Sequence, residues 1–115
     1  MNILITGCAG FIGYSLSLKL LKSNKKINII GFDNLNKFYS VKLKNKRLSI
    51  LKKYKNFKFL KIDLTNKKKL IHLFKSNKIN IIYHFAAQAG VRYVSTHPHK
   101  FISSNILGFH NLLDV

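Results

Sequence analysis

Glutamate and tryptophan are absent from this sequence of 115 residues, and cysteine and proline each occur once. The single cysteine, Cys8, excludes an internal disulfide framework and a cysteine-based zinc site, and it is typical of a reducing compartment. No apolar run approaches the roughly 18 residues of a membrane-spanning helix, and the first residues lack the basic start of a signal peptide. We therefore expect a cytoplasmic protein with no membrane partner.

Acidic residues are also scarce, because three aspartates stand against 21 basic residues and leave a net charge of +18. Such an excess raises nucleic acid as a partner. However, the basic residues are spread along the whole chain, match no nucleic-acid-binding motif, and accompany abundant Asn and Ile, as an AT-rich coding sequence would give. The longest run, Lys67–Lys69, is typical of a solvated helix face. We do not expect nucleic acid as a partner, and a stand-alone basic module that binds nucleotide or nucleic acid is the alternative.

Short β-rich runs alternate with longer segments of helical period. Strands are predicted over Asn2–Thr6, Ile27–Phe32, Phe57–Ile62 and Ile79–Phe85, and helices over Phe11–Ser23, Val41–Tyr54 and Asn66–Asn77. This alternation implies right-handed crossovers and a parallel sheet with helices on both faces. We predict one α/β domain over residues 1–115, with Rossmann-like strand order 3-2-1-4. A last helix is expected to start at Pro98, and the chain ends inside its pattern.

Three glycines follow the first predicted strand, in the segment Gly7-Cys-Ala-Gly10-Phe-Ile-Gly13. A strand, a glycine turn and a helix in this order direct backbone N–H groups and the positive helix end toward one point, where a pyrophosphate is stabilised. Gly7 permits the tight turn, Gly10 lets the backbone approach a phosphate, and Gly13 lets the helix pack closely. The spacing differs from the G-x-G-x-x-G of dinucleotide-binding folds, so a purely structural turn is the alternative.

Asp33 directly follows the second predicted strand. A carboxylate there accepts hydrogen bonds from the adenosine ribose hydroxyls and repels a 2′-phosphate, which favours NAD over NADP. Lys37 and its neighbours would soften this preference by screening the repulsion. The alternative is that Asp33 only caps the turn at Asn34. The cofactor that we predict is NAD.

Five segments together resemble the extended short-chain dehydrogenases/reductases. They are Ile3–Gly13, Asp33–Asn36, Asp63–Leu64, His84–Tyr93 and Ser104–Gly108. Within that superfamily the chain is similar to the NAD-dependent nucleotide-sugar epimerases, and most of all to the UDP-glucuronate 4-epimerases. The resemblance covers essentially the whole chain, and its most subfamily-specific stretch is Ala86-Ala-Gln-Ala-Gly-Val-Arg92.

The resemblance implies where the ligands bind. The pyrophosphate would lie on Gly7, Gly10, Phe11, Ile12 and Gly13, and the adenosine ribose on Asp33, Asn34 and Asn36. Asp63 and Leu64 would flank the adenine. Phe85, Ala86, Ala87 and Gln88 would lie under the nicotinamide half, and Asn105 matches the family's structural asparagine. Gly90, Val91 and Arg92 match the loop near the nucleotide-sugar substrate, where Arg92 would meet a carboxylate or phosphate or only order its own loop.

The resemblance also implies the chemistry. These epimerases oxidise C4 of the sugar with a Tyr-x-x-x-Lys pair and a Ser or Thr, which would lie well beyond position 115. Tyr54 and Lys58 have the same spacing, but they precede or begin the third predicted strand, far from the nicotinamide, so we assign them no catalytic role. We expect the chain to be the N-terminal, NAD-binding portion of such an enzyme, without its catalytic and substrate part and inactive alone. Val94 replaces a serine that is usual in the family, which puts a sugar-side hydrogen bond in doubt.

The remaining features point to no further site. Cys8 lies near a helix N-terminus, so it is either an oxidisable thiol of lowered pKa or a small buried filler, and the filler is preferred. The histidines offer no metal site, because His97 and His99 lack a third ligand. In the family's sheet a fifth strand follows the fourth on its outer side. We therefore expect Ile79–Phe85 to present an open apolar edge, through which the chain self-associates or meets a missing C-terminal half.

Overall fold

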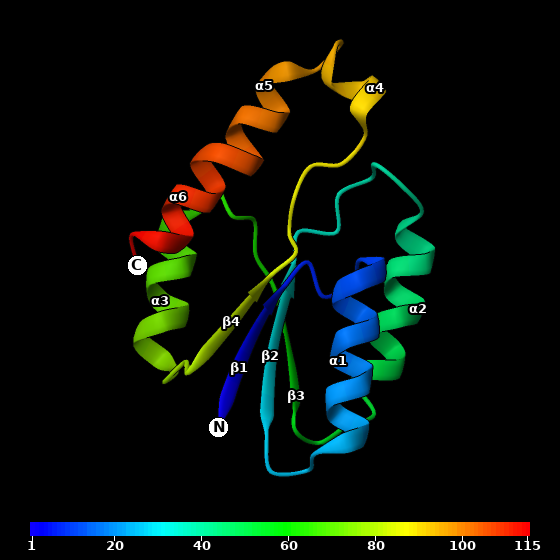
Figure 1. The fold of residues 1–115 in the computed structure, drawn as a ribbon, viewed down its shortest axis with the longest axis vertical. Coiled ribbons are helices and arrows are strands. Elements are labelled where there is room, and N and C mark those ends of the chain that lie inside the picture. Colours follow the sequence, from blue (N-terminus) through cyan, green and yellow to red (C-terminus); the bar gives the residue numbers. More distant parts are fainter. The chain divides into compact units, whose positions relative to one another are not determined.

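The computed structural model describes residues 1–115 (Figure 1). The strands are β1 (Asn2–Thr6), β2 (Asn28–Asp33), β3 (Phe57–Lys61) and β4 (Ile81–His84). The helices are α1 (Phe11–Ser23), α2 (Val41–Leu51), α3 (Lys67–Ser76), α4 (Val91–Val94), α5 (Pro98–Phe101), the π-helix η1 (Ile102–Leu107) and α6 (Gly108–Leu113). The chain divides into two compact units, residues 1–61 with 78–86 and residues 62–77 with 87–115, which we name the sheet unit and the helical unit.

The sheet unit holds all four strands, which run parallel in the order β3-β2-β1-β4. β1 is central, because Leu4 pairs with Ile30 of β2 on one side and with Ile82 of β4 on the other. The strands alternate with helices along the chain. The predicted α/β fold with Rossmann-like order 3-2-1-4 is thus confirmed. The order reverses between β1 and β4, and in such sheets ligands bind beyond the carboxyl ends of the strands at this point.

Apolar side chains of β1 and β2 form the centre of the core in the sheet unit. Ile5 and Ile29 are almost fully buried and belong to one cluster with Leu21 of α1 and Leu48 of α2. α1 and α2 lie side by side along one face of the sheet (Figure 1). The two helices are therefore held by packing of their apolar faces, which is the main source of helix stability in proteins.

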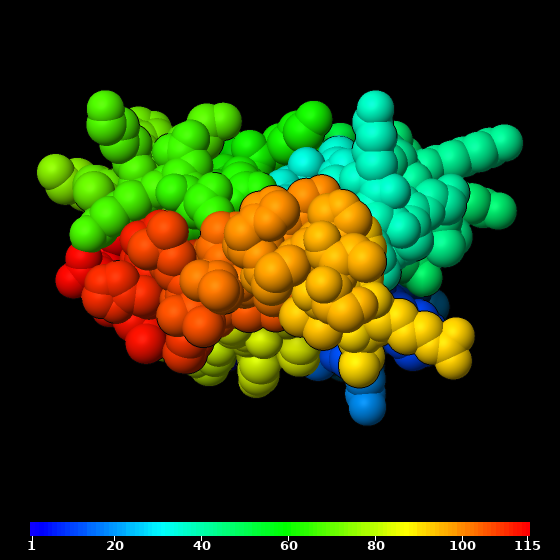
Figure 2. All heavy atoms as spheres, turned by 90° about the horizontal axis from the view of Figure 1, so that it is seen from above, coloured from blue at the N-terminus to red at the C-terminus, as the bar shows by residue number.

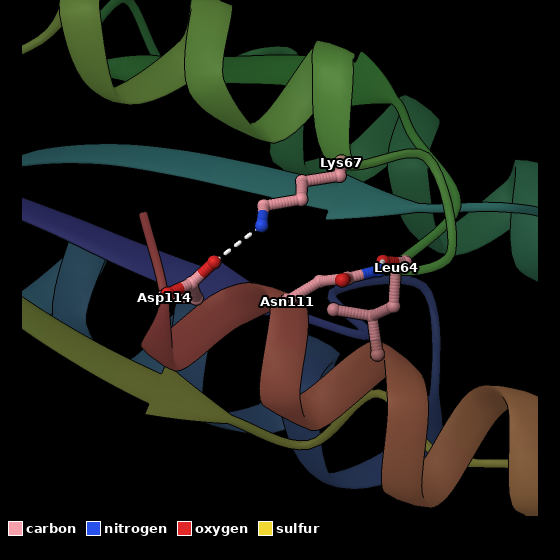
Figure 3. Close-up of polar contacts among 4 residues, drawn as sticks. All are labelled: Leu64, Lys67, Asn111 and Asp114. Atoms are coloured by element: carbon pink, nitrogen blue, oxygen red, sulfur yellow. Dashed lines mark hydrogen bonds and ion pairs between the residues drawn. The ribbon is translucent and has the colours of Figure 1, made fainter.

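In the helical unit, α3 packs against α6. Asn111 of α6 donates a hydrogen bond to the carbonyl oxygen of Leu64 at 3.1 Å, and Lys67 forms an ion pair with Asp114 (Figure 3). A hydrogen bond from Lys67 holds the pKa of the Asp114 carboxyl below its usual value. Gly108 permits the close approach of α6, because a Cβ at this position would lie 2.7 Å from Leu64 Cβ.

Several element ends differ from the prediction. α2 ends at Leu51 instead of Tyr54, because the Tyr54 N–H bonds back to the Leu51 carbonyl and the chain turns. β4 is shorter than the predicted strand at both ends, and the N–H groups that follow it bond to Thr6. α3 begins one residue late because Asn66 is its N-cap, with a side chain that accepts a hydrogen bond from the Lys69 N–H.

The last helix begins at Pro98, as the sequence predicts, but it is not uniform. It starts as α5, widens to the π-helix η1 and continues as α6. Apolar spacing does not distinguish a π-helical turn from an α-helical one, so this widening was not predicted. π-Helical turns within helices are frequent at functional sites. The short helix α4 was not predicted either.

Basic side chains extend into solvent from separate segments of both units. Figure 2 shows long side chains projecting from the region of α2 (teal) and from the region of α3 (green). All three residues of Lys67–Lys69 are exposed, as a solvated helix face requires. None of the helices combines the length and the apolar composition that crossing a bilayer demands.

Candidate functional site

Gly7 begins the turn that follows β1. Its φ of +66° lies in the left-handed region, which glycine adopts without strain. A Cβ at this position would also lie 2.8 Å from the backbone nitrogen of Ala86, in the chain that leaves β4. A side chain at position 7 is therefore excluded both by backbone conformation and by space.

α1 starts directly after this turn, and we name residues 7–13 the glycine loop. The Gly10 N–H donates to the Gly7 carbonyl at 2.9 Å, and Gly10 is an N-cap without a side-chain hydrogen bond to the helix. The side chains of Phe11 and Ile12 are exposed, which leaves the start of α1 lined by backbone. A Cβ at Gly13 would lie 2.3 Å from the Gly7 carbonyl oxygen, so helix and turn are in direct contact. Uncapped N–H groups and the positive helix end meet here, as anion binding requires.

Asp33, the last residue of β2, joins the glycine loop to the next turn. Its Oδ2 accepts a hydrogen bond from the Ala9 N–H at 3.3 Å, and its Oδ1 accepts one from the Leu35 N–H at 2.8 Å. The carboxylate is 8% exposed. Asn34 Oδ1 accepts a hydrogen bond from the Asn36 N–H at 3.0 Å, which continues the turn. Asp33 thus caps the turn that follows β2, as the alternative interpretation of this residue requires. Each of its carboxylate oxygens accepts one hydrogen bond here and keeps a second lone pair for a ligand.

The chain after β4 is held by Thr6, whose side chain is fully buried. The Thr6 hydroxyl accepts hydrogen bonds from the N–H groups of Phe85 and Ala86, each at 3.0 Å. Because both lone pairs are used, the hydroxyl donates its own proton to Nδ1 of His84 at 2.7 Å. His84 is therefore the neutral tautomer that carries its proton on Nε2. The sequence gives no signal for this contact, which depends on the pairing of β1 with β4.

Acid is expected to destabilise the sheet unit through His84. Burial lowers the pKa of His84, and protonation of Nδ1 removes the acceptor of the Thr6 hydroxyl. A lowered pKa means that this contribution to stability is complete above the ordinary histidine pKa of 6.5 and is lost as the pH falls through the lower pKa of the folded state. Thermal unfolding, measured from above pH 6.5 down into the acid range, tests the expectation.

The matched variants are His84→Gln and His72→Gln, the second of which changes an exposed histidine of α3. On mild acidification, the Tm of His84→Gln should decrease less than the Tm of the unmodified protein. The Tm of His72→Gln should decrease as much as that of the unmodified protein. If all three proteins lose the same Tm over this range, His84 is not the group responsible.

Cys8 is fully buried within the glycine loop. Burial, followed by the nearby Asp33 carboxylate, raises the pKa of the thiol. A Cβ at Gly31 of β2 would lie 2.7 Å from Cys8 Sγ, so the thiol packs against a glycine. The preferred interpretation, a buried filler, fits these contacts. The alternative of a lowered thiol pKa is wrong, because burial and the Asp33 carboxylate outweigh the backbone hydrogen bond and the Lys52 charge, which act to lower it.

Asp63 and Leu64 belong to the helical unit and form the turn before α3. Asp63 Oδ1 accepts hydrogen bonds from the N–H of Thr65 at 2.9 Å and from its hydroxyl at 2.7 Å. Leu64 is buried, and its carbonyl binds Asn111. The Asp63 side chain therefore shapes its own turn, and the role of both residues beside an adenine stays a prediction.

Asn105, on the π-helix η1, binds the main chain of Gln88 twice. Its Oδ1 accepts from the Gln88 N–H at 2.7 Å, and its Nδ2 donates to the Gln88 carbonyl at 3.1 Å. The carboxamide is thus committed to backbone, which fits the structural role that the family resemblance implies. Of the residues that precede Gln88, Phe85 and Ala87 are exposed and Ala86 is half-buried.

Gly90, Val91 and Arg92 begin the short helix α4. Gly90 has a φ of +104°, which suits glycine, and it is the N-cap of this helix. Val91 and Arg92 are exposed, and the Arg92 carbonyl accepts a hydrogen bond from the Ser95 hydroxyl at 2.9 Å. The guanidinium is therefore accessible, and its role toward a substrate stays a prediction.

Tyr54 and Lys58 lie at the wrong end of the sheet for catalysis. Tyr54 precedes β3, at the amino ends of the parallel strands, whereas the glycine loop follows the carboxyl end of β1. Tyr54 packs against the core, and Lys58 is exposed on β3. Elsewhere in the chain no three His, Cys, Asp or Glu side chains gather as metal ligands.

Residues 4–115 match the family model described as GDP-mannose 4,6 dehydratase. A UDP-glucuronate 4-epimerase of Thermodesulfobacterium geofontis is 46% identical over 112 residues, which are 97% of this chain and 34% of that protein. The UDP-glucuronate 4-epimerase 6 of Arabidopsis thaliana is 43% identical over 115 residues, which are 100% of this chain and 24% of that protein. The chain thus spans 34% and 24% of the length of these two curated relatives.

Solved structures give the same result. The UDP-glucuronic acid 4-epimerase of Bacillus cereus, in complex with UDP-glucuronic acid and NAD, matches with a TM-score of 0.89 at 33% identity, over 99% of this chain and 35% of that one. The dTDP-glucose 4,6-dehydratase of Bacillus anthracis, in complex with NAD, matches with a TM-score of 0.80 at 31% identity, over 99% of this chain and 33% of that one. The chain therefore belongs to the NAD-dependent epimerase/dehydratase family.

Proposed function

We propose that this chain is the NAD-binding part of a nucleotide-sugar 4-epimerase of the UDP-glucuronate type. The observation that carries the proposal is the glycine loop, which opens α1 without a side-chain cap and is bonded to the buried carboxylate of Asp33. The similarity to an epimerase that is in complex with UDP-glucuronic acid and NAD supports it. The nucleotide sugar would be the substrate of the whole enzyme.

The residues of the sheet unit fit NAD. The N–H groups at the start of α1 would hold the pyrophosphate, with Phe11 and Ile12 turned to solvent. Gly10 leaves space for it, because a Cβ there would meet only the Gly7 carbonyl at 3.1 Å and the Tyr39 hydroxyl at 3.9 Å. The remaining acceptor capacity of Asp33 would serve the adenosine ribose.

NAD, when bound, supplies the acceptor for the hydride removed from C4 of the sugar. The residues of this chain bind and orient the two ligands. The backbone of Phe85 and Ala86, fixed by Thr6, would border the nicotinamide half, and Gly90–Arg92 would lie toward the sugar nucleotide. Proton transfer in the family needs a Tyr-x-x-x-Lys pair next to the nicotinamide, and this chain provides none there. We expect no turnover by these 115 residues alone.

Calorimetric titration with NAD and NADP tests the assignment. NAD should bind more tightly than NADP, because Asp33 repels a 2′-phosphate. Asp33→Ala should weaken NAD binding about ten-fold or more through the loss of charge-assisted hydrogen bonds to the ribose. Asp114→Ala removes an exposed carboxylate of the helical unit and should bind NAD as the unmodified protein does. Unchanged NAD binding by Asp33→Ala would show that the assignment is wrong.

The net charge of +18 favours one competing function, a stand-alone basic module that binds nucleic acid. Salt distinguishes the two functions. If this chain attracts a random-sequence DNA duplex only through its overall positive charge, that affinity should fall steeply between low and physiological salt, because counterions are released on binding. If duplex binding persisted at physiological salt while NAD and NADP bound equally weakly, the basic module would be the better description.

Self-association through β4 is the partner interaction that we propose for the chain by itself. β3 and β4 are the two edges of the sheet. β3 carries the exposed Lys58 and Lys61, which is a common protection against edge pairing, whereas β4 exposes Ile81, Ile82 and Tyr83. A second copy can extend the sheet at β4. Association should increase with salt, because salt screens the repulsion between strongly basic chains.

Sedimentation velocity at low and high salt measures this association. Ile82→Lys places a charge on the β4 edge and should give a monomer. Ile106→Lys changes another exposed apolar residue, on η1, and should leave association unchanged. A protein that stays monomeric at high salt and high concentration would show that the β4 edge is protected in solution.

A further inference from the structure

Lys44 of α2 is the one buried lysine among the 19 of this chain, with 3% of its side chain exposed. Burial lowers the pKa of its ammonium group, against the opposing effect of Asp33. A buried lysine is rare in proteins because its charge must leave water, so it needs compensating contacts. The function proposed above assigns no role to this residue.

The contacts of Lys44 converge on the turn after β2. Its Nζ donates to the backbone carbonyl of Asn36 at 2.9 Å and to the Asn36 side-chain oxygen at 3.0 Å. The same ammonium lies 4.5 Å from the centre of the Tyr39 ring, in cation–π distance. Lys44 therefore holds the turn against α2 by binding both oxygen atoms of one residue, Asn36.

The fastened turn has a strained backbone. Leu35 has a φ of +56°, a left-handed conformation that is uncommon for a residue with a side chain. Such a conformation persists only where surrounding contacts impose it. Here the Leu35 N–H donates to Asp33 Oδ1, and the next residue, Asn36, is bonded to Lys44. The orientation of the Asp33 carboxylate is thus tied to Lys44 through two residues.

Arg47 lies one turn further along the same face of α2 and holds the other loop. Its Nη1 donates to the Ala9 carbonyl at 3.1 Å and contacts the Tyr39 hydroxyl at 3.2 Å. The Ala9 N–H is already bonded to Asp33. The two backbone polar groups of Ala9 are therefore both held in place. Its N–H is bonded to Asp33, and its carbonyl oxygen is bonded to Arg47.

We propose that Lys44 and Arg47 are positioning residues of the nucleotide site. Lys44 keeps the Asp33 carboxylate aimed at the ribose hydroxyls, and Arg47 keeps the glycine loop open for the pyrophosphate. Their ligand is the ADP half of the dinucleotide, which both residues serve without touching it. This inference rests on the proposed NAD function.

Hydrogen exchange without cofactor tests whether Lys44 restrains the turn after β2. Lys44→Met keeps an unbranched side chain as far as Cε and removes the ammonium, so the Leu35 amide should exchange about ten-fold faster, the consequence of losing a hydrogen-bonded restraint. The Ile29 amide, which bonds to Asn56 in the sheet, should not change. Lys46→Met changes an exposed lysine of the same helix and is the matched control. Asn36→Ala weakens the contact from its other side and serves if Lys44→Met does not fold.

Calorimetry with NAD tests whether the contacts of Lys44 and Arg47 contribute to NAD binding. Lys44→Met and Arg47→Met should each weaken NAD binding about ten-fold, whereas Lys46→Met should not. Because Lys44 acts through Asp33, Lys44→Met should have little further effect in an Asp33→Ala background. A merely structural role would instead give additive losses in the double variant.

The outcomes separate this inference from the proposed function. Unchanged exchange of the Leu35 amide in both Lys44→Met and Asn36→Ala overturns the inference whatever the affinities are. Faster exchange with unchanged NAD affinity, or with additive losses in the double variant, overturns it while the NAD assignment stands. An unmodified protein that binds no NAD overturns the proposed function and the inference with it.

Discussion

Gly13→Ala is expected to destabilise the protein, although alanine favours helices over glycine by about 1 kcal/mol. Gly13 lies in the first turn of α1, and a Cβ there would be 2.3 Å from the Gly7 carbonyl oxygen. Both groups belong to backbone, so no side-chain rotation relieves the overlap and α1 must move from the turn. Overpacking of this kind costs about 1–3 kcal/mol or more. We expect a net loss of about 2 kcal/mol and a Tm lower by roughly 10 °C.

Chemical and thermal unfolding measure this loss. Lys19→Ala, at an exposed position of the same helix, should change stability by no more than about 0.5 kcal/mol. Gly13→Ala should also weaken NAD binding, because the movement of α1 displaces the amides that would hold the pyrophosphate. A variant as stable as the unmodified protein would show that α1 tolerates a side chain against the turn.

The order of strands and helices was predictable because each of these elements has a local signal in the sequence. The apolar runs of β1 and β2, the glycine turn between β1 and α1, and the apolar spacing of α3 all depend on neighbouring residues. Right-handed crossovers then restrict the arrangement to a parallel sheet of order 3-2-1-4. The element ends were less predictable, because caps and bonds to side chains decide them. β4 ends where the Thr6 hydroxyl takes the next two N–H groups.

The candidate site was predictable only where its residues are close in sequence. Gly7 and Gly13 belong to one short glycine motif after β1, Asp33 ends β2, and family motifs marked all three. Lys44 could not be recognised among 19 lysines, because its burial and its contact with Asn36 depend on how α2 packs. Thr6 gives no sequence signal either, because its partners lie 78 to 80 residues further along the chain.

Thr6→Val is expected to be among the most destabilising substitutions in the sheet unit. Valine has nearly the same shape but offers no hydroxyl, so the Ala86 N–H and His84 Nδ1 lose their bond to residue 6, and the Phe85 N–H keeps only the Thr6 carbonyl at 3.3 Å. Each buried polar group left unpaired costs about 1–3 kcal/mol, and the half-burial of His84 and Ala86 places both groups in the lower part of this range. We therefore expect a loss of about 2–4 kcal/mol, a large part of the total stability of a small domain.

Thr6→Ser provides the matched control, because serine keeps the hydroxyl and removes only a buried methyl group, at a cost of about 1 kcal/mol. Hydrogen exchange locates the effect, since the Ala86 amide should lose protection in Thr6→Val and keep it in Thr6→Ser. A valine variant no less stable than the serine variant would show that water or a shifted backbone replaces the hydroxyl. The chain after β4 would then owe its position to β1 pairing alone, and the Thr6 hydroxyl would have no part in holding the residues proposed to border the nicotinamide.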